Sequence, residues 1–352
     1  MNIDINNLLR ENIKKLTPYS SARDEFKGEA SVLLDANENA YGSPLETNYN
    51  RYPDPLQLKL KAKISAIKGV PTNNIFIGNG SDEAIDLLFR AFCRPGIDNV
   101  LIVPPTYGMY EVSANINDVA IKKVNLTADF QLDLNAMAEA VDAHTKLIFI
   151  CSPNNPTGNS ISRIDIETIV NNFDGLVIID EAYINFARQK SFTQELAEYN
   201  NVVVLQTLSK AWGLAGLRIG MAFASEEIIH IFNKIKPPYN INQASQQLAL
   251  EALEGIDGIN AWIKETVHER EQLRAALLDL PFVLRVYPSD ANFILVQVTE
   301  PKNIYQYLVH LGIIIRDRSS VVHCEGCLRV TIGTPTENRQ LLQALMNYGS
   351  KN

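Results

Sequence analysis

Short apolar runs alternate with longer amphipathic stretches through the first two thirds of this 352-residue chain. Near-continuous apolar strands that alternate with helices are typical of a mostly parallel sheet covered by helices on both faces, and functional side chains then gather at the carboxyl ends of the strands. The predicted strands are Ile75–Gly78, Val100–Val103, Lys146–Cys151, Leu176–Asp180, Val202–Gln206 and Ile219–Ala224.

The pattern changes in the last third of the chain. It is long and helical from about Asn242 to Asp279, with an interruption near Gly255–Gly258. Strand-like runs at Phe293–Val298, Ile313–Arg316 and Leu328–Ile332 then alternate with a helix near Ile304–Leu311, which predicts a smaller α/β domain. We expect residues 41–245 to form the large domain and residues 246–352 the small C-terminal domain. Residues 1–40 are expected to form an N-terminal arm and a segment that joins the small domain.

Composition narrows the class of protein. The formal net charge of -8 and the absence of long basic runs argue against nucleic acid as a partner. No apolar run approaches the ~20 residues of a membrane span. Met1–Leu16 mixes charged and apolar residues, so it predicts an amphipathic arm packed on the body or on a partner subunit rather than a signal peptide. The expected location is cytoplasmic.

Four cysteines are too few for a disulfide framework in a chain of this size. Cys324 and Cys327 lie beside His323, a spacing that suggests a zinc or redox site. A zinc site needs a second pair of ligands, which the sequence does not offer, so no metal is predicted.

The segment Thr207–Gly220 carries the strongest chemical signal. Lys210 lies among small and hydroxyl residues, Arg218 follows it, and Asp180 ends an earlier strand. A lysine amine can form a Schiff base with the aldehyde of pyridoxal phosphate, and an aspartate can keep the pyridine nitrogen protonated so that the ring accepts electrons. Thr207, Ser209 and Arg218 offer hydroxyls and a cation for the phosphate. A Ser-Lys pair alone would be interpreted as an ordinary surface feature. The presence of Asp180 and Arg218 favours a cofactor site instead.

Other strand ends add candidate cofactor ligands. Ser81 or Asp82 caps a helix whose free backbone amides suit a phosphate, although such caps are common. Tyr107 follows the next strand and could stack on a planar ring, or be an ordinary loop tyrosine. Asn155 could donate to a phenolate-like oxygen, and Tyr183 lies three residues after Asp180.

Two arginines in the C-terminal domain suggest an anion site. Arg316 and Arg329 each lie near the end of a predicted strand. They could clamp a carboxylate or phosphate of a substrate, or form surface salt bridges.

In these residues and their order, the chain resembles the fold-type I pyridoxal phosphate enzymes and, within them, the histidinol-phosphate aminotransferase family. The resemblance covers almost the whole chain. The motifs that carry it, besides those at Asn155, Asp180 and Lys210, are Leu16–Arg23, Leu34–Asn39, Arg51–Pro55 and Cys327–Thr334.

The resemblance implies a role for each candidate. Lys210 would be the Schiff-base lysine and proton shuttle, Asp180 the partner of the pyridine nitrogen, and Tyr107 the residue stacked on the ring. Asn155 and Tyr183 would donate to the ring oxygen. The phosphate ligands would be Ser81, Asp82, Thr207, Ser209 and Arg218, with Tyr52 as a further phosphate ligand from the neighbouring subunit. The substrate-binding residues would be Tyr19, Arg316 and Arg329. A homodimer with shared active sites is therefore expected.

The implied reaction moves an amino group between glutamate and imidazole-acetol phosphate, giving 2-oxoglutarate and L-histidinol phosphate. Three alternatives remain open at this point. They are another aminotransferase, for example for aromatic amino acids; a decarboxylase of an amino acid phosphate on the same frame; and a cofactor-bound regulatory module without enzyme activity.

Overall fold

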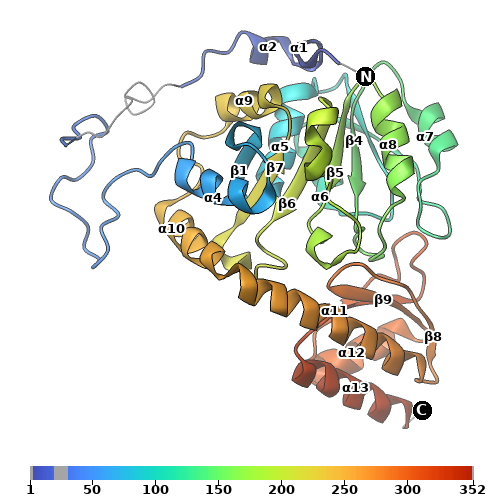
Figure 1. Ribbon diagram of the computed structural model, residues 1–352. Helices are drawn as coiled ribbons and strands as arrows, with labels where there is room; N and C mark the ends of the chain where they lie inside the picture. The colour runs from blue at the N-terminus through green and yellow to red at the C-terminus, as the bar shows by residue number, and fades with distance from the viewer. Residues whose placement is uncertain (1–2, 20–30, 351–352) are drawn as a thin grey trace.

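Figure 1 shows the computed structural model, which describes residues 3–19 and 31–350. A seven-stranded sheet with helices on both faces forms the larger part, and a four-stranded sheet with its own helices forms the smaller part. The long helix α11 (Ile256–Leu278) leads from one part to the other. The predicted α/β architecture is confirmed; the exact domain boundaries remain a prediction.

The large sheet contains all six strands that the apolar runs predicted, plus one more. Its spatial order is β1-β7-β6-β5-β4-β2-β3. The strands are β1 (Ile75–Asn79), β2 (Asn99–Ile102), β3 (Ala120–Lys123), β4 (Thr145–Cys151), β5 (Leu176–Asp180), β6 (Val202–Thr207) and β7 (Ile219–Phe223). The unpredicted strand is β3, which lies at the edge of the sheet and has no buried residue, so it lacks the apolar run of a covered strand.

The direction of β7 matters for function. β7 runs antiparallel to both β1 and β6, whereas β6, β5, β4, β2 and β3 pair in parallel. The amino end of β7 therefore lies at the same edge as the carboxyl ends of the other strands. The residues that precede β7 consequently meet the residues that follow β1, β4, β5 and β6.

Helices cover both faces of the large sheet because successive strand residues point to opposite sides. In β5, Val177 and Ile179 belong to one apolar cluster, while Leu176 and Ile178 belong to the other. The elements around the large sheet are α4 (Leu58–Lys68), η1 (Thr72–Asn74), α5 (Ser81–Phe92), α6 (Met109–Ile116), α7 (Leu134–Ala140), α8 (Arg163–Asn172), η2 (Ile184–Phe186), η3 (Phe192–Glu198), η4 (Ala215–Leu217) and α9 (Glu226–Ile235).

The predicted helical stretch is present and is interrupted close to the expected place. α10 (Gln243–Ala252) is separated from α11 by the short 3-10 helix η5 (Leu253–Gly255). The small sheet is fully antiparallel, in the order β10-β11-β9-β8. Its elements are β8 (Val283–Val286), β9 (Phe293–Val298), α12 (Pro301–His310), β10 (Arg316–Asp317), β11 (Cys327–Thr331) and α13 (Pro335–Gly349).

One strand prediction in this part is wrong in detail, and one strand was missed. β10 begins only at Arg316, so the run Ile313–Ile315 precedes the strand instead of forming it. β8 was not predicted; Leu284 and Arg285 are exposed, so the strand shows no apolar run.

The N-terminal arm packs on the large part of the molecule. It forms two short helices, α1 (Ile5–Leu8) and α2 (Glu11–Lys14). Ile5 and Leu9 are buried in the same cluster as residues of α5 and α9, and the backbone amide of Arg10 donates to the carbonyl of Ala91 at 3.0 Å. The part of the Leu16–Arg23 motif after Tyr19 lies outside the described residues. Among the described residues, no helix is long and apolar enough to cross a bilayer.

Candidate active site

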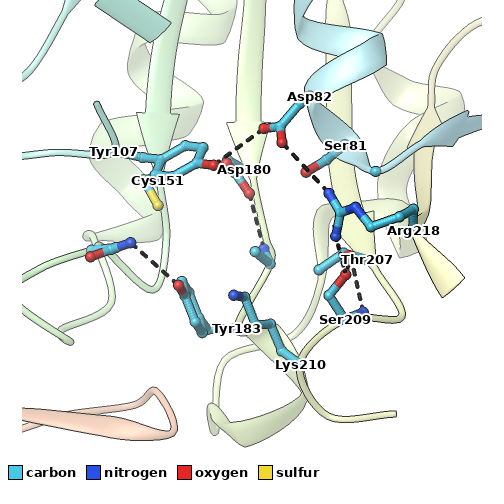
Figure 2. A pocket seen from close by; sticks show the side chains of 13 residues that line it. Ser81, Asp82, Tyr107, Cys151, Asp180, Tyr183, Thr207, Ser209, Lys210 and Arg218 are labelled. Atoms are coloured by element: carbon cyan, nitrogen blue, oxygen red, sulfur yellow. Dashed lines mark hydrogen bonds and ion pairs between the residues drawn. The ribbon is translucent and has the colours of Figure 1, made fainter. Parts of the chain in front are cut away.

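A pocket opens at the edge where the strand ends meet (Figure 2). Ten of the predicted cofactor residues line it, together with three that were not predicted, Gly80, Cys151 and Ala182. The ten are Ser81, Asp82, Tyr107, Asn155, Asp180, Tyr183, Thr207, Ser209, Lys210 and Arg218. The cavity measures ≈ 170 Å³. A cavity of about 150 Å³ holds benzene, so this pocket has room for one substituted aromatic ring.

One end of the pocket is suited to an anion. Helix α5 begins at Ser81, so the backbone amides of its first turn lack helical partners. Arg218, just before β7, brings its guanidinium within 3.5 Å of the Ser209 hydroxyl and 3.8 Å of the Asp82 carboxylate. The Thr207 hydroxyl donates to Ser209 Oγ at 2.9 Å, which fixes both oxygens beside the arginine. Amides, hydroxyls and a cation converge as a phosphate requires.

Two glycines allow this close approach of the backbone. A Cβ atom on Gly220 would lie 2.0 Å from the amide nitrogen of Ser81, and one on Gly80 would lie 2.6 Å from Arg218 Nη2. Gly80 also has a φ of +74°, which other residues rarely adopt. The sequence analysis did not single out Gly220, because nothing local in the sequence reveals contact with a helix start over a hundred residues earlier.

Asp180 lies at the bottom of the pocket and is only 3% exposed. Burial raises the pKa of its carboxyl group, against hydrogen bonds from Tyr110 and from the amide of Ala182. An ionised carboxylate at this depth needs a cationic partner, and the protonated nitrogen of a pyridine ring would be one.

Sequence reasoning missed Tyr110, which holds Asp180 from behind. Its hydroxyl donates to Asp180 Oδ2 at 2.7 Å, and its side chain is completely buried. Its ring stacks on Phe149 with centroids 4.8 Å apart. The available signal was spacing: Tyr110 follows Tyr107 by three residues at the start of a helix, and such residues share a face.

Tyr107 closes another side of the pocket. Its hydroxyl donates to Asp82 Oδ1 at 3.2 Å, and its ring meets that of Tyr110 edge-on. Burial, with the nearby charge of Asp82, raises the pKa of Tyr107, so the hydroxyl stays protonated. The apolar face of a fixed ring is thus available at the pocket wall.

Asn155 and Tyr183 form a pair of donors. The side-chain amide of Asn155 donates to the Tyr183 hydroxyl at 3.3 Å, and its carbonyl oxygen accepts a hydrogen bond from Arg329. Because Arg329 occupies that carbonyl, the amide group of Asn155 is left to face Tyr183 and the pocket. Burial raises the pKa of Tyr183. Both groups can therefore donate to one oxygen of a bound ring.

Lys210 points into the pocket between these groups (Figure 2), with its Nζ atom 5.6 Å from the centroid of the Tyr183 ring. Its pKa is lowered, mainly because the pocket walls remove water and then because of Arg329 and Arg218. Asp180 opposes this effect without reversing it. A lowered pKa increases the share of neutral amine, the form that acts as nucleophile and base.

Comparison with known proteins agrees with this geometry. The profile of class I and II aminotransferases matches residues 27–345. A histidinol-phosphate aminotransferase of Cytophaga hutchinsonii is 55% identical over 348 residues, which span 99% of this chain and 100% of that protein. The chain belongs to the histidinol-phosphate aminotransferase family of the class I and II aminotransferases.

Solved structures of the same fold include two activities. The histidinol-phosphate aminotransferase of Clostridium acetobutylicum superposes with a TM-score of 0.79 at 24% identity, covering 86% of this chain and 92% of that one. An L-threonine-O-3-phosphate decarboxylase of Porphyromonas gingivalis superposes with a TM-score of 0.73 at 23% identity, covering 85% and 91%. The fold alone therefore does not distinguish transamination from decarboxylation.

Pyridoxal phosphate is the cofactor of this aminotransferase, and the pocket fits it. A phosphate-sized cradle without Cβ atoms at Gly80 and Gly220 lies at one end. At the other end lies the buried carboxylate of Asp180, which has no ion pair with a described residue. Lys210 lies on a third side of the pocket, beside Tyr183, with its amine toward the pocket. These features match the three parts of the cofactor: phosphate, ring nitrogen and aldehyde.

Four predicted residues of this aminotransferase, Tyr19, Tyr52, Arg316 and Arg329, lie outside the pocket lining. Tyr19 is 73% exposed and Tyr52 is 50% exposed. The Tyr52 ring stacks on Tyr239 with centroids 4.5 Å apart, and both line a separate hollow. Arg316 pairs with Arg329 across the small sheet, and of these two only Arg329 contacts a pocket residue, Asn155.

The Cys324–Cys327 pair does not resemble a reactive site. Both thiols are buried, and burial raises the pKa of Cys324 to about 12 and that of Cys327 to about 11. Zinc binding and thiol redox chemistry both use the thiolate, which is scarce at such pKa values. The described residues contain no group of three metal-ligating side chains.

Proposed function

We propose that this aminotransferase exchanges an amino group between L-histidinol phosphate and 2-oxoglutarate, with imidazole-acetol phosphate and glutamate as the other pair, in histidine biosynthesis. The observation that carries the chemistry is the single pocket that Lys210, the buried Asp180 and the anion-binding end at Arg218 line together. The choice of substrate follows relatives that are 55% identical over nearly the whole chain.

In this proposal the amides of Ser81 and Asp82, together with Thr207, Ser209 and Arg218, would hold the cofactor phosphate. Asp180 would face the ring nitrogen, Asn155 and Tyr183 would donate to the ring oxygen, and Tyr107 would cover one side of the ring. When bound, pyridoxal phosphate withdraws electrons from the carbon that bears the substrate amine.

The protein groups then have separate tasks. Lys210 binds the cofactor while no substrate is present, and afterwards it takes a proton from the substrate carbon and returns it at the carbon that carried the aldehyde. Its lowered pKa suits both directions of transfer. Hydrogen bonds from Tyr110 and from the amide of Ala182 favour the ionised form of Asp180, and a protonated ring nitrogen would supply the cationic partner that this form needs.

In this proposal, arginines of the small sheet bind the anionic groups of the substrates. Arg329 contacts Asn155, so a guanidinium lies beside the ring-oxygen donors. Arg316 is its partner across the sheet. One site must accept a phosphate ester in one half of the reaction and a dicarboxylate in the other, and guanidinium groups bind both anions.

The proposal includes a homodimer with shared active sites. Tyr52 is exposed within its own chain and lies outside the Lys210 pocket, which supports a role in the phosphate site of a neighbouring subunit. Tyr19 would contact substrate in the assembled enzyme. Cytoplasmic location remains part of the proposal.

The test is a single half-reaction. The protein loaded with pyridoxal phosphate is mixed separately with L-histidinol phosphate, phenylalanine and threonine phosphate. We expect rapid conversion of the cofactor spectrum to the pyridoxamine form with histidinol phosphate. Conversion by phenylalanine in preference would change the substrate and keep the reaction type. Release of carbon dioxide from threonine phosphate would show that the protein is a decarboxylase and would contradict the proposed transamination.

A further inference from the structure

The small sheet presents three arginines on one face. Arg316 lies opposite Arg329 in the antiparallel register of β10 and β11, and residues directly opposite each other point to the same side. The amide of Arg318 donates to the carbonyl of Cys327 at 2.9 Å, which continues the same register. Since side chains alternate along an extended chain, Arg318 points to the same side as Arg316. We call Arg316, Arg318 and Arg329 the arginine face.

This face looks toward the large sheet and its pocket. In the small sheet, Leu328 and Val330 belong to the apolar cluster beneath α12 and α13. Cys327, by contrast, belongs to the cluster that contains Tyr183. Arg329 alternates with Leu328 and Val330, and its hydrogen bond to Asn155 places it at the pocket. Arg318, on the same side, lies near enough to lower the pKa of Arg329, and the Tyr183 side chain in turn raises the pKa of Arg318.

The arginine face is rich in positive charge that lacks a counter-ion. Among the described residues, none of its three arginines forms a salt bridge with a carboxylate in the chain. The neighbouring carboxylate of Asp317 accepts hydrogen bonds from the amide and hydroxyl of Ser319 instead. The Nε atoms of Arg318 and Arg329 are both buried and have no hydrogen-bond partner within residues 3–19 and 31–350.

Such an arrangement is costly in the free protein. Burial lowers the pKa of Arg318 and of Arg329; the charge of Arg316 lowers the pKa of Arg318 further, and the charges of Arg318 and Arg316 lower that of Arg329. Buried cations without partners are unfavourable unless a ligand supplies the negative charge. Two guanidinium groups could hold a carboxylate or a phosphate, whereas a third adds attraction mainly for an anion with a second negative charge. A phosphate monoester has a second pKa near 6 and is largely a dianion at neutral pH.

We propose that Arg318 is a substrate-binding residue that selects the dianionic phosphate monoester over the singly charged side-chain carboxylate of the other substrate. The inference rests on the proposed function, because it assigns Arg318 to the anion end of the same substrate site. It adds a third guanidinium, two residues after Arg316, to the pair that the sequence analysis recognised.

The experiment compares the two amino donors in variants at this position. Arg318→Gln removes the charge, Arg318→Lys keeps it, and Arg339→Gln removes an exposed arginine of α13 as the matched control. We expect Arg318→Gln to raise KM for histidinol phosphate about 10- to 100-fold, as for loss of a charged hydrogen bond, and KM for glutamate less than about threefold. The kcat values and the cofactor spectrum should stay close to wild type, and Arg318→Lys should recover part of the loss.

Other results would overturn the assignment. An equal rise in both KM values would mean a general charge effect, and a fall in kcat with unchanged KM would mean a structural role.

The unreactive anions propyl phosphate and glutarate separate this inference from the proposed function, with binding followed by calorimetry. Suppose that the wild-type protein binds propyl phosphate but does not react with histidinol phosphate, and that Arg318→Gln no longer binds propyl phosphate. The proposed function is then wrong, whereas the anion site is supported. If wild type reacts but Arg318→Gln binds both anions normally, only the anion site fails.

Discussion

The cofactor end of the pocket and the arginine face differ in how their polar groups are satisfied. At the cofactor end, Thr207, Ser209 and Arg218 hydrogen-bond to one another, and Asp180 accepts bonds from Tyr110 and Ala182. On the arginine face, the Nε atoms of Arg318 and Arg329 have no partner among the described residues. The first region is organised before any ligand arrives. The second region keeps unpaired positive charge that is available to a substrate, which binds and dissociates in each turnover.

The difference follows from the backbone that supports each region. The cofactor residues sit at the ends of buried strands in one large sheet, so their positions are set by the core. Arg316 and Arg318 sit in or directly after the edge strand β10, which is only two residues long, and Arg329 lies in the neighbouring strand β11 of the small sheet. A resident cofactor benefits from rigid, prearranged groups. A site that must accept two different anions benefits from long side chains that keep some freedom.

Removal of Lys210 should have the largest effect. Lys210→Ala leaves the phosphate end and Asp180 intact, so the protein should fold and retain some cofactor. It removes the acid and base, so kcat should fall by at least about 10²–10⁴-fold. Steady-state kinetics provide the measurement, with Lys61→Met as control, because Lys61 is also a buried lysine but lies outside the pocket. A wild-type rate in Lys210→Ala would refute the assignment.

Removal of Arg329 should separate the two regions. Arg329→Ala should weaken the binding of both anionic substrates about 10- to 100-fold, because each loses a charged hydrogen bond. The bound cofactor should keep its absorption spectrum. Half-reaction titrations with histidinol phosphate and glutamate measure this. Arg285→Ala, in β8 of the same sheet, is the matched control. Loss of cofactor instead of substrate would show that Arg329 belongs to the cofactor end.

A single methyl group at Gly220 should damage only the cofactor end. The Cβ of Gly220→Ala would lie 2.0 Å from the Ser81 amide, which is backbone and cannot rotate away. Overpacking of this kind costs about 1–3 kcal/mol, and the shifted helix start should bind the cofactor phosphate more weakly. Thermal unfolding and cofactor titration measure the two effects. Gly258→Ala, in α11 with open space around it, should leave both unchanged or slightly improved.

Tyr110→Phe should have the smallest effect. The change removes the hydrogen bond that favours the ionised form of Asp180, so the pKa of that carboxyl should rise further. Cofactor affinity should fall by about 2- to 10-fold, and its loss on acidification should begin at a higher pH than in wild type. Tyr348→Phe removes a similar bond, to Glu300 at 2.9 Å, far from the pocket. That control should not change cofactor binding; an equal effect in both variants would contradict the role of Tyr110.

Much of the cofactor end could be predicted from the sequence, because its residues follow apolar strands that are recognisable one by one. Asp180, Thr207 and Ser81 each come at the end of such a strand or directly after it, and parallel strands bring their ends together. Arg218 joins them because β7 runs the other way, a direction that its apolar pattern does not reveal.

The rest depends on contacts that no local pattern encodes. Gly220 and Tyr110 act through distant partners, Ser81 and Asp180, and each looks ordinary in its own segment. Arg318 became visible only when the register of β10 and β11 placed it beside Arg329. The proposed roles of Tyr19 and Tyr52 involve an assembly that a single chain does not contain, so they stay predictions.

The most direct test of the account identifies the lysine that holds the cofactor. The loaded protein is reduced with borohydride, which fixes the cofactor to its lysine, and the labelled peptide is found by mass spectrometry. The account predicts a label on Lys210 alone, lost when histidinol phosphate is added before reduction. Lys61 is the informative competitor, because burial and Lys236 lower its pKa to about 8. A label on Lys61 or any other lysine, with Lys210 unmodified, would contradict the central claim.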